Sequence, residues 1–124
     1  MIEQADVMNV LLGGCPTFEK DWDEFVHDYG NDLLYPAVGI FARHLLRLFQ
    51  SDDAVSLAAA GSAIERLIVE GSPYVQELAV VGVLEGIQNV WSNNKVDPEN
   101  FFPYLGCESG KAWKELNRAW SGQS

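Results

Sequence analysis

The residues best suited to chemistry gather in one short stretch, residues 18–32, which reads FEKDWDEFVHDYGND. It holds several carboxylates and one histidine, His27. On a helix, Asp23 and His27 lie four residues apart and share a face, where they could form an acid–base pair or begin a metal site. Two ligands are too few for a stable metal site. We therefore expect His27 to be a solvated histidine paired with a carboxylate.

The other reactive side chains form no catalytic grouping. The sequence contains no HExxH zinc motif, phosphate-binding loop, GxSxG nucleophile elbow or EF-hand loop. Cys15 precedes Pro16 at a predicted helix start, where a thiolate is favoured, although such a thiol is more often a plain loop or core residue. We expect His44 to be a partly exposed helix residue. The sequence therefore predicts a protein that is not an enzyme, with no catalytic residue, no metal and no cofactor.

The two cysteines, Cys15 and Cys107, lie far apart and lack the spacing of a metal pair or a CxxC motif. We expect reduced thiols in a cytoplasmic protein, with a disulfide between them left open as the alternative. Glu3 and Asp6 stand where a secretory signal would carry basic residues. Three basic residues interrupt the longest apolar stretch, so the sequence predicts no membrane span.

The carboxylates of residues 18–32 are better explained by binding than by catalysis. The formal net charge of the chain is −10, which argues against direct contact with nucleic acids or anionic membranes and favours a basic protein partner. The alternative is a solvated face that only keeps the protein soluble. On the binding interpretation, the aromatic residues at the edge of the face would supply the strongest contacts. The predicted partner-binding residues are Glu19, Asp21, Asp23, Glu24, Asp28, Asp32, Tyr29 and Trp22.

Helical periodicity accounts for most of the chain and positions these residues. Phe18, Trp22, Phe25 and Tyr29 recur at intervals of four, three and four, which predicts one apolar stripe on a helix. Ser51 is the predicted cap of a following helix that is rich in alanine. Predicted helices cover about residues 2–12, 17–29, 32–50, 52–70, 73–91 and 108–120, with a short helical turn at 97–104.

These elements predict an all-α fold of six or seven helices in a single domain, residues 1–124. The helix of residues 73–91 is apolar on most of its circumference, which is typical of a buried central helix. Similar helix lengths and tight connections favour stacked antiparallel hairpins, as in HEAT-like solenoids. No internal repeat is visible, so a compact irregular bundle is the equal alternative.

The C-terminal stretch carries a resemblance. It contains the pattern F-x-P-Y-L-G-x-x-S-x-x-x-W-x-x-L-x-x-x-W, formed by Phe101, Pro103, Tyr104, Leu105, Gly106, Ser109, Trp113, Leu116 and Trp120. This ending and the helices before it resemble small acidic bacterial immunity proteins of polymorphic and contact-dependent growth inhibition toxin systems. The resemblance covers about the last two-thirds of the chain. It transfers no catalytic residue, and its motif residues look structural.

The resemblance and the charge together predict an immunity protein. Its partner would be the C-terminal domain of a cognate toxin, a basic protein and often a nuclease, whose active site must be basic to hold phosphates. The acidic surface would cover that active site. The alternative is a non-catalytic helical adaptor or regulatory scaffold. The oligomeric state and the activity of the toxin stay open.

Overall fold

A computed structural model describes residues 1–120, and over that range it confirms the all-α prediction. The seven α-helices are joined by tight turns and by short 3-10 or π-helical segments. Their bounds are α1 Val7–Gly14, α2 Glu19–Tyr29, α3 Leu34–Gln50, α4 Ala54–Glu70, α5 Pro73–Glu77, α6 Glu85–Asn93 and α7 Cys107–Trp120. The other segments are η1 Gln4–Asp6, η2 Pro16–Phe18, the π-helical η3 Leu78–Leu84, and η4 Pro98–Tyr104.

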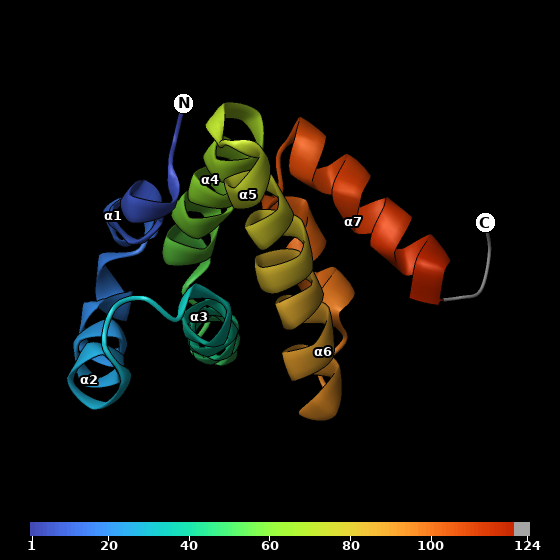
Figure 1. Cartoon of the computed structure of the whole chain (residues 1–124). Coiled ribbons are helices and arrows are strands. Elements are labelled where there is room, and N and C mark those ends of the chain that lie inside the picture. The colour runs from blue at the N-terminus through green and yellow to red at the C-terminus, as the bar shows by residue number, and fades with distance from the viewer. Residues whose placement is uncertain (121–124) are drawn as a thin grey trace.

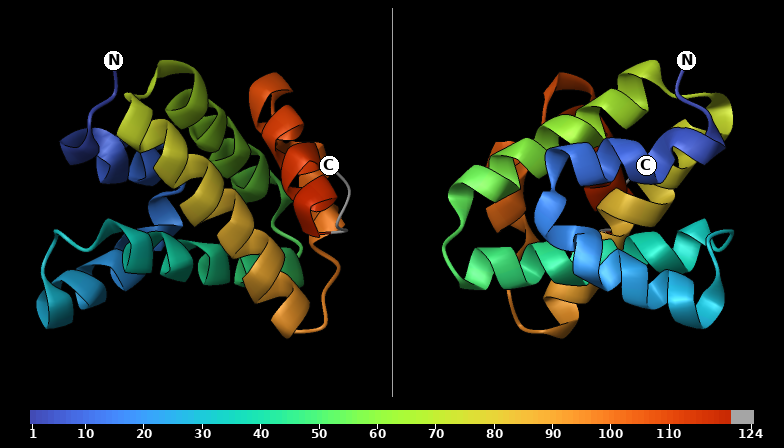
Figure 2. Two further views of the ribbon diagram at one scale, coloured as in Figure 1. Left: turned by 45° about the vertical axis from the view of Figure 1, so that its right-hand side comes forward. Right: turned by 90° about the vertical axis from the view of Figure 1, so that its left-hand side faces the viewer.

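The helices form a compact bundle and do not stack as successive hairpins. In Figures 1 and 2, α3 runs across α4 and across the long rod made by α5, η3 and α6. α1 and α7 pack on opposite sides of α4 (Figure 1). α2 lies at one end of the molecule and packs on α3. Of the two predicted architectures, the compact irregular bundle is therefore the one adopted.

The connection between α3 and α4 differs in detail from the prediction. Asp53, and not Ser51, caps α4: its side chain accepts a hydrogen bond from the Ser56 backbone N–H at 3.1 Å. The Ser51 hydroxyl donates instead to backbone carbonyls at the C-terminal end of α3. The predicted cap at Ser72 is confirmed, with Pro73 at the first helical position of α5.

The N-terminal segment is extended where a helix was predicted. Ile2 forms an isolated parallel bridge with Gly71, in which its N–H donates to the Glu70 carbonyl at 2.7 Å. The predicted helix stop at residues 13 and 14 also comes too early, because both glycines are the last residues of α1. A Cβ on Gly14 would lie only 2.7 Å from that of Ala63. Gly14 thus serves the close approach of α1 to α4.

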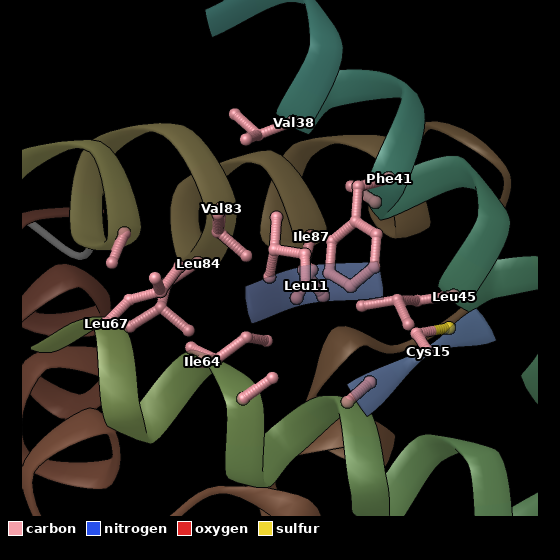
Figure 3. Close-up of a cluster of buried hydrophobic side chains, with 14 of the residues drawn as sticks. Leu11, Cys15, Val38, Phe41, Leu45, Ile64, Leu67, Val83, Leu84 and Ile87 are labelled. Carbon is pink, nitrogen blue, oxygen red and sulfur yellow. The ribbon is translucent and has the colours of Figure 1, made fainter. Parts of the chain in front are cut away.

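The rod from Pro73 to Asn93 is less buried than predicted. Its central segment η3 is π-helical, and Val81 there is 47% exposed. The opposite side of the rod packs into the core through Val83, Leu84 and Ile87. Figure 3 shows these side chains meeting Phe41 and Leu45 of α3, together with residues of α1 and α4. This single core fixes the position of α3, against which α2 lies.

Candidate binding surface on α2 and α3

The carboxylates of α2 do not form one continuous face. Asp21, Glu24 and Asp28 are spaced three and four residues apart, so they share the flank of α2 that lies beside α3. Glu19 and Asp23 are four residues apart and lie on the other flank. The two flanks are separated by Lys20 and His27, and Asp32 lies beyond the helix in the loop to α3. The structure thus divides the predicted acidic surface into two parts.

Asp21 already has a cationic partner inside the molecule. Its Oδ2 forms an ion pair with Nη2 of Arg47 on α3, and it lies 3.4 Å from Nδ1 of His44. On the other side of the imidazole, Nε2 of His44 is 2.8 Å from the hydroxyl of Thr17. These contacts tie the start of α2 to the middle of α3. Asp21 therefore stabilises the packing of α2 on α3.

His44 is buried, with 8% of its surface exposed, and the prediction of a partly exposed residue is wrong. Its ring packs against Phe18, with ring centroids 5.6 Å apart. Burial lowers the pKa of His44, and the nearby Asp21 carboxylate only partly opposes that effect. A neutral His44 at pH 7 fits its position, because one ring nitrogen faces a hydroxyl and the other a carboxylate.

The two predicted aromatic contacts differ in accessibility. Tyr29 is 64% exposed at the C-terminal end of α2, beside Phe25. Trp22 is half-buried, and its ring stacks on Phe25 with centroids 6.0 Å apart. Trp22 and Asp32 line a separate hollow of about 520 Å³ with residues of η1 and α1 and with Leu34 at the start of α3. Tyr29 is thus available to a partner on the α3 side, whereas Trp22 contributes mainly to packing.

An apolar groove runs between α2 and α3, which we call the α2–α3 groove. It has a volume of about 430 Å³ and opens to solvent. It is lined by Phe25, Tyr29, Leu33, Pro36, Gly39, Ile40, Arg43 and Val90. A smaller hollow of about 260 Å³ adjoins it and shares four of these residues. That hollow is bordered by Asp21, Glu24 and Asp28 from α2 and by Arg43 and Arg47 from α3. The carboxylates of this flank thus form an acidic rim on the α2 side of the groove.

Apolar surface continues from the groove over the start of α3. Leu33 and Tyr35 are exposed, and the Tyr35 ring meets that of Tyr74 edge-on with centroids 6.4 Å apart. Partial burial, followed by the nearby Glu77 carboxylate and Tyr74, raises the pKa of Tyr35. The exposed Val81 lies on the adjoining segment η3, which contacts α3.

The remaining candidate groups stay apart from one another. His27 is exposed, and its Nδ1 contacts the carboxylate of Asp28 at 3.2 Å, as expected of a solvated histidine. Cys15 is buried and Cys107 is exposed, and both thiols are free. Within residues 1–120, no three His, Cys, Asp or Glu side chains are grouped to hold a metal ion. Nor does any helix there have the length and apolar character needed to cross a membrane.

The C-terminal motif serves to dock α7. Glu65 of α4 accepts hydrogen bonds from the backbone N–H groups of Glu108 and Ser109 and from the Ser109 hydroxyl, at 3.0, 2.8 and 2.7 Å. The indole N–H of the buried Trp113 donates to Glu99 at 2.6 Å. Ser109 and Trp113 of the motif thus attach α7 to α4 and to η4, as expected of structural residues.

Comparison with known proteins places the chain in a family. A family model described as a domain of unknown function, DUF7674, matches residues 8–121. The chain belongs to this family. No curated protein and no solved structure matches it significantly. The DUF7674 match begins within α1 and extends through α7, so the α2–α3 groove lies inside the family's domain.

Two parts of this DUF7674 surface were not predicted from sequence. The Thr17–His44–Asp21–Arg47 cluster joins residues up to 30 positions apart in the chain, and only the packing of α2 on α3 brings them together. The groove likewise depends on how α2 and α3 cross. A weak signal existed for the cluster: His44 and Arg47 are three residues apart on one helix, on the side that faces a helix rich in carboxylates.

Proposed function

We propose that this protein is an immunity protein that binds the basic C-terminal domain of a cognate toxin and blocks it. The proposed contact surface is the α2–α3 groove with its acidic rim. In this proposal the protein inhibits by occupying the partner's surface and performs no chemistry itself. The partner is most simply a nuclease, because a nuclease active site is basic and can be covered by carboxylates in place of phosphates.

The observation that carries the proposal is the position of exposed carboxylates beside an exposed apolar groove. Glu24 and Asp28 stand at the rim of the groove, and among residues 1–120 neither has a lysine or arginine partner. Tyr29 and Leu33 line the same groove and are exposed. Protein interfaces gain most of their affinity from such apolar and aromatic anchors, and an acidic rim adds faster encounter with a basic partner.

Arg43 gives the surface a feature that charge alone would not supply. It is exposed, lines both the groove and the adjoining hollow, and forms no ion pair within residues 1–120. A partner that fills the groove must therefore place an acceptor, such as a carboxylate or carbonyl, opposite Arg43. A generally basic surface would be repelled there, so Arg43 favours one cognate partner over many.

The resemblance of the C-terminal motif to immunity proteins supports the same function, although that motif docks α7 and does not itself form the groove. The net charge of −10 is consistent with a basic partner. The test begins with the tagged full-length protein as bait in its native cells, at low and at moderate salt. We expect one dominant basic protein, captured at equal stoichiometry. Several partners of comparable abundance would support the adaptor alternative.

Matched charge variants then test the surface. Glu24→Gln/Asp28→Asn removes two charges from the rim, and Asp52→Asn/Glu115→Gln removes two exposed charges elsewhere. At about 0.2–1 kcal/mol for each exposed ion pair, the rim variant should weaken binding of the captured partner about 2- to 30-fold. The control variant should change binding much less. Equal effects of the two variants would show that the rim is not the contact surface.

A growth assay tests inhibition separately from binding. The basic domain of the captured partner should arrest growth when it is expressed alone, and co-expression of the protein should restore growth. Tyr29→Ala should reduce the protection, because it removes an exposed anchor of the groove without opening the core. If the partner domain is harmless, or if the protein binds without protecting, the immunity function is refuted.

A further inference from the structure

The α2–α3 groove is lined in part by a glycine that lies inside a helix. Gly39 belongs to α3, more than one turn from either end, and it lines the groove beside Ile40. Glycine inside a helix lowers the stability of a protein relative to alanine, because the unfolded chain has more conformational freedom to lose. A glycine at this position therefore calls for a reason in packing or in binding.

Packing among residues 1–120 does not require the glycine at position 39. A Cβ added to Gly39 would meet nothing within 4 Å. Its φ is not positive, so alanine could adopt the same backbone conformation. The contrast is with five glycines at which a Cβ would lie 2.9 Å or less from another atom, namely Gly14, Gly61, Gly71, Gly82 and Gly106. The fold would therefore accept alanine at position 39, and the reason for the glycine lies in binding.

Position 39 lies where the groove crosses α3. Phe25 and Tyr29 of α2 and Val90 of α6 line the groove, and α3 packs on both of these helices. Figure 1 shows α3 between α2 and α6. Because a Cβ on Gly39 would stand in open space beside the groove, the glycine leaves room that a larger residue would fill. The groove volume of about 430 Å³ is within the range of small-molecule sites, so the groove has room for one large side chain.

Charges of opposite sign flank this space. Arg43 follows Gly39 by one helical turn on α3, is exposed and forms no ion pair among residues 1–120. Glu24 and Asp28 stand on the α2 side, in the hollow that adjoins the groove. A segment that enters with an apolar side chain at its centre can therefore place an acceptor at Arg43 and a cation at the two carboxylates. The reversed orientation would bring like charges together, so these charges select one orientation of the segment.

We propose that Gly39 is the seat of one large apolar side chain of the protein's partner, which packs there against the backbone of α3. The inference rests on the proposed function, under which the partner is the toxin domain. It names the feature of that domain that the groove recognises: a Phe, Leu or Trp flanked by a cation and an acceptor. Apolar anchors that fill a pocket at the centre of an interface carry much of its affinity. A helix that keeps glycine at such a seat gives up stability for recognition.

Two glycine variants test the seat with the captured partner. Gly39→Ala and Gly13→Ala each add a methyl group that meets nothing within 4 Å in the free protein, so both should raise the midpoint of urea unfolding. Because the added methyl group overpacks a seat that the partner fills, Gly39→Ala should weaken binding about 5- to 150-fold. Gly13→Ala, on α1, should bind as the natural protein does. Equal binding by the two variants, or a lower unfolding midpoint for Gly39→Ala, overturns the inference and leaves the immunity function standing.

A small probe tests the groove without the toxin. N-acetylphenylalanine amide carries an aromatic ring for the seat and carbonyl acceptors for Arg43. Titrated into the ¹⁵N-labelled full-length protein, it should shift the backbone N–H signals of Gly39 and Ile40 in a saturable way, with a Kd on the order of 1 mM. N-acetylalanine amide, which lacks the ring, should cause no saturable shift at the same concentration.

Gly39→Leu should abolish the shifts at Ile40 while its circular dichroism stays unchanged, because the leucine side chain would occupy the seat. Gly13→Ala should keep the shifts. The inference is overturned if the phenylalanine probe causes no shift at roughly 20 mM, about 20-fold above the expected Kd, or if the shifts survive in Gly39→Leu. The two proposals can fail separately. Shifts at Gly39 in a protein that captures no basic partner support the seat and refute the toxin, whereas a captured toxin that binds Gly39→Ala normally refutes the seat alone.

Discussion

The attachment of α7 to α4 through Glu65 yields the sharpest prediction about stability. Glu65 caps α7 from outside that helix, since it accepts two backbone N–H groups of the first turn and the Ser109 hydroxyl. Loss of an N-cap costs about 1–2 kcal/mol, and loss of a negative charge at a helix N-terminus costs about 0.3–1 kcal/mol. Glu65→Ala should therefore lower the free energy of unfolding by about 1.5–3 kcal/mol.

Urea unfolding followed by circular dichroism measures this loss, with Glu108→Gln as the control. Glu108 lies in the same first turn of α7, but its side chain is exposed and, among residues 1–120, its ion pair is with Lys111, so its replacement removes one charge near the helix N-terminus and one exposed ion pair and should cost at most about 1 kcal/mol. Glu65→Gln keeps the shape and one acceptor oxygen of the carboxylate. It should fall between the control and Glu65→Ala.

The pH dependence separates the charge of Glu65 from its shape. Burial raises the pKa of Glu65, but the hydrogen bonds from Ser109 and Glu108 outweigh burial and lower the pKa below its ordinary value of 4.5. The folded protein thus binds the proton more weakly than the unfolded chain does. The stabilisation is complete above pH 4.5 and is lost as the pH falls through the lower folded pKa. The natural protein and Glu65→Gln should converge in acid, and equal differences at pH 7 and pH 3 would refute this account of the cap.

Three further predictions concern other parts of the molecule. Gly61→Ala should strongly lower the midpoint of urea unfolding, because the new Cβ would lie 2.0 Å from a backbone oxygen of η4. At Gly13 a new Cβ meets nothing within 4 Å, so Gly13→Ala should raise the free energy of unfolding by up to about 1 kcal/mol. Burial lowers the pKa of His44 in the folded protein, so the neutral ring stabilises the fold fully above about pH 6.5 and this stabilisation is lost as the pH falls. His44→Gln should therefore weaken the pH dependence of the free energy of unfolding between about pH 7 and 5. A thiol reagent should label the exposed Cys107 within minutes and the buried Cys15, whose pKa is raised by burial, only when the protein unfolds.

The sequence was informative where a signal is local. The apolar stripe of residues 18–29 is enough to predict α2, since Phe18 and Phe25 must face a core at helical spacing. The proline after Ser72 likewise marks the start of α5. Such signals depend on a few neighbouring residues, so they hold whatever the tertiary structure is. They fail at the N-terminus, where Ile2 pairs with a segment about 70 residues away in the sequence.

The sequence was least informative about which carboxylates are free. Asp21 and Glu24 are alike in type and neighbourhood along the chain, yet only Asp21 meets Arg47. That difference arises from the position of α2 along α3, which local spacing does not encode. The same holds for His44, whose burial follows from the contact between Thr17 and the far side of its ring. The hydrogen bond from Gln88 to Asn117 was not predicted for the same reason, because the two residues come from different helices.

The division among the α2 carboxylates bears on how the surface works. Asp21 forms an ion pair with Arg47 and so links α2 to α3, the two helices between which the groove lies. Glu24 and Asp28 stand four residues apart, where like charges repel by a few tenths of a kcal/mol. Folding gains nothing from that repulsion, and a basic partner would relieve it. The repulsion slightly lowers the stability of the free protein, and its relief by a basic partner would add to the free energy of binding. This is the relation expected under the proposed function, in which Asp21 serves folding while Glu24 and Asp28 serve recognition.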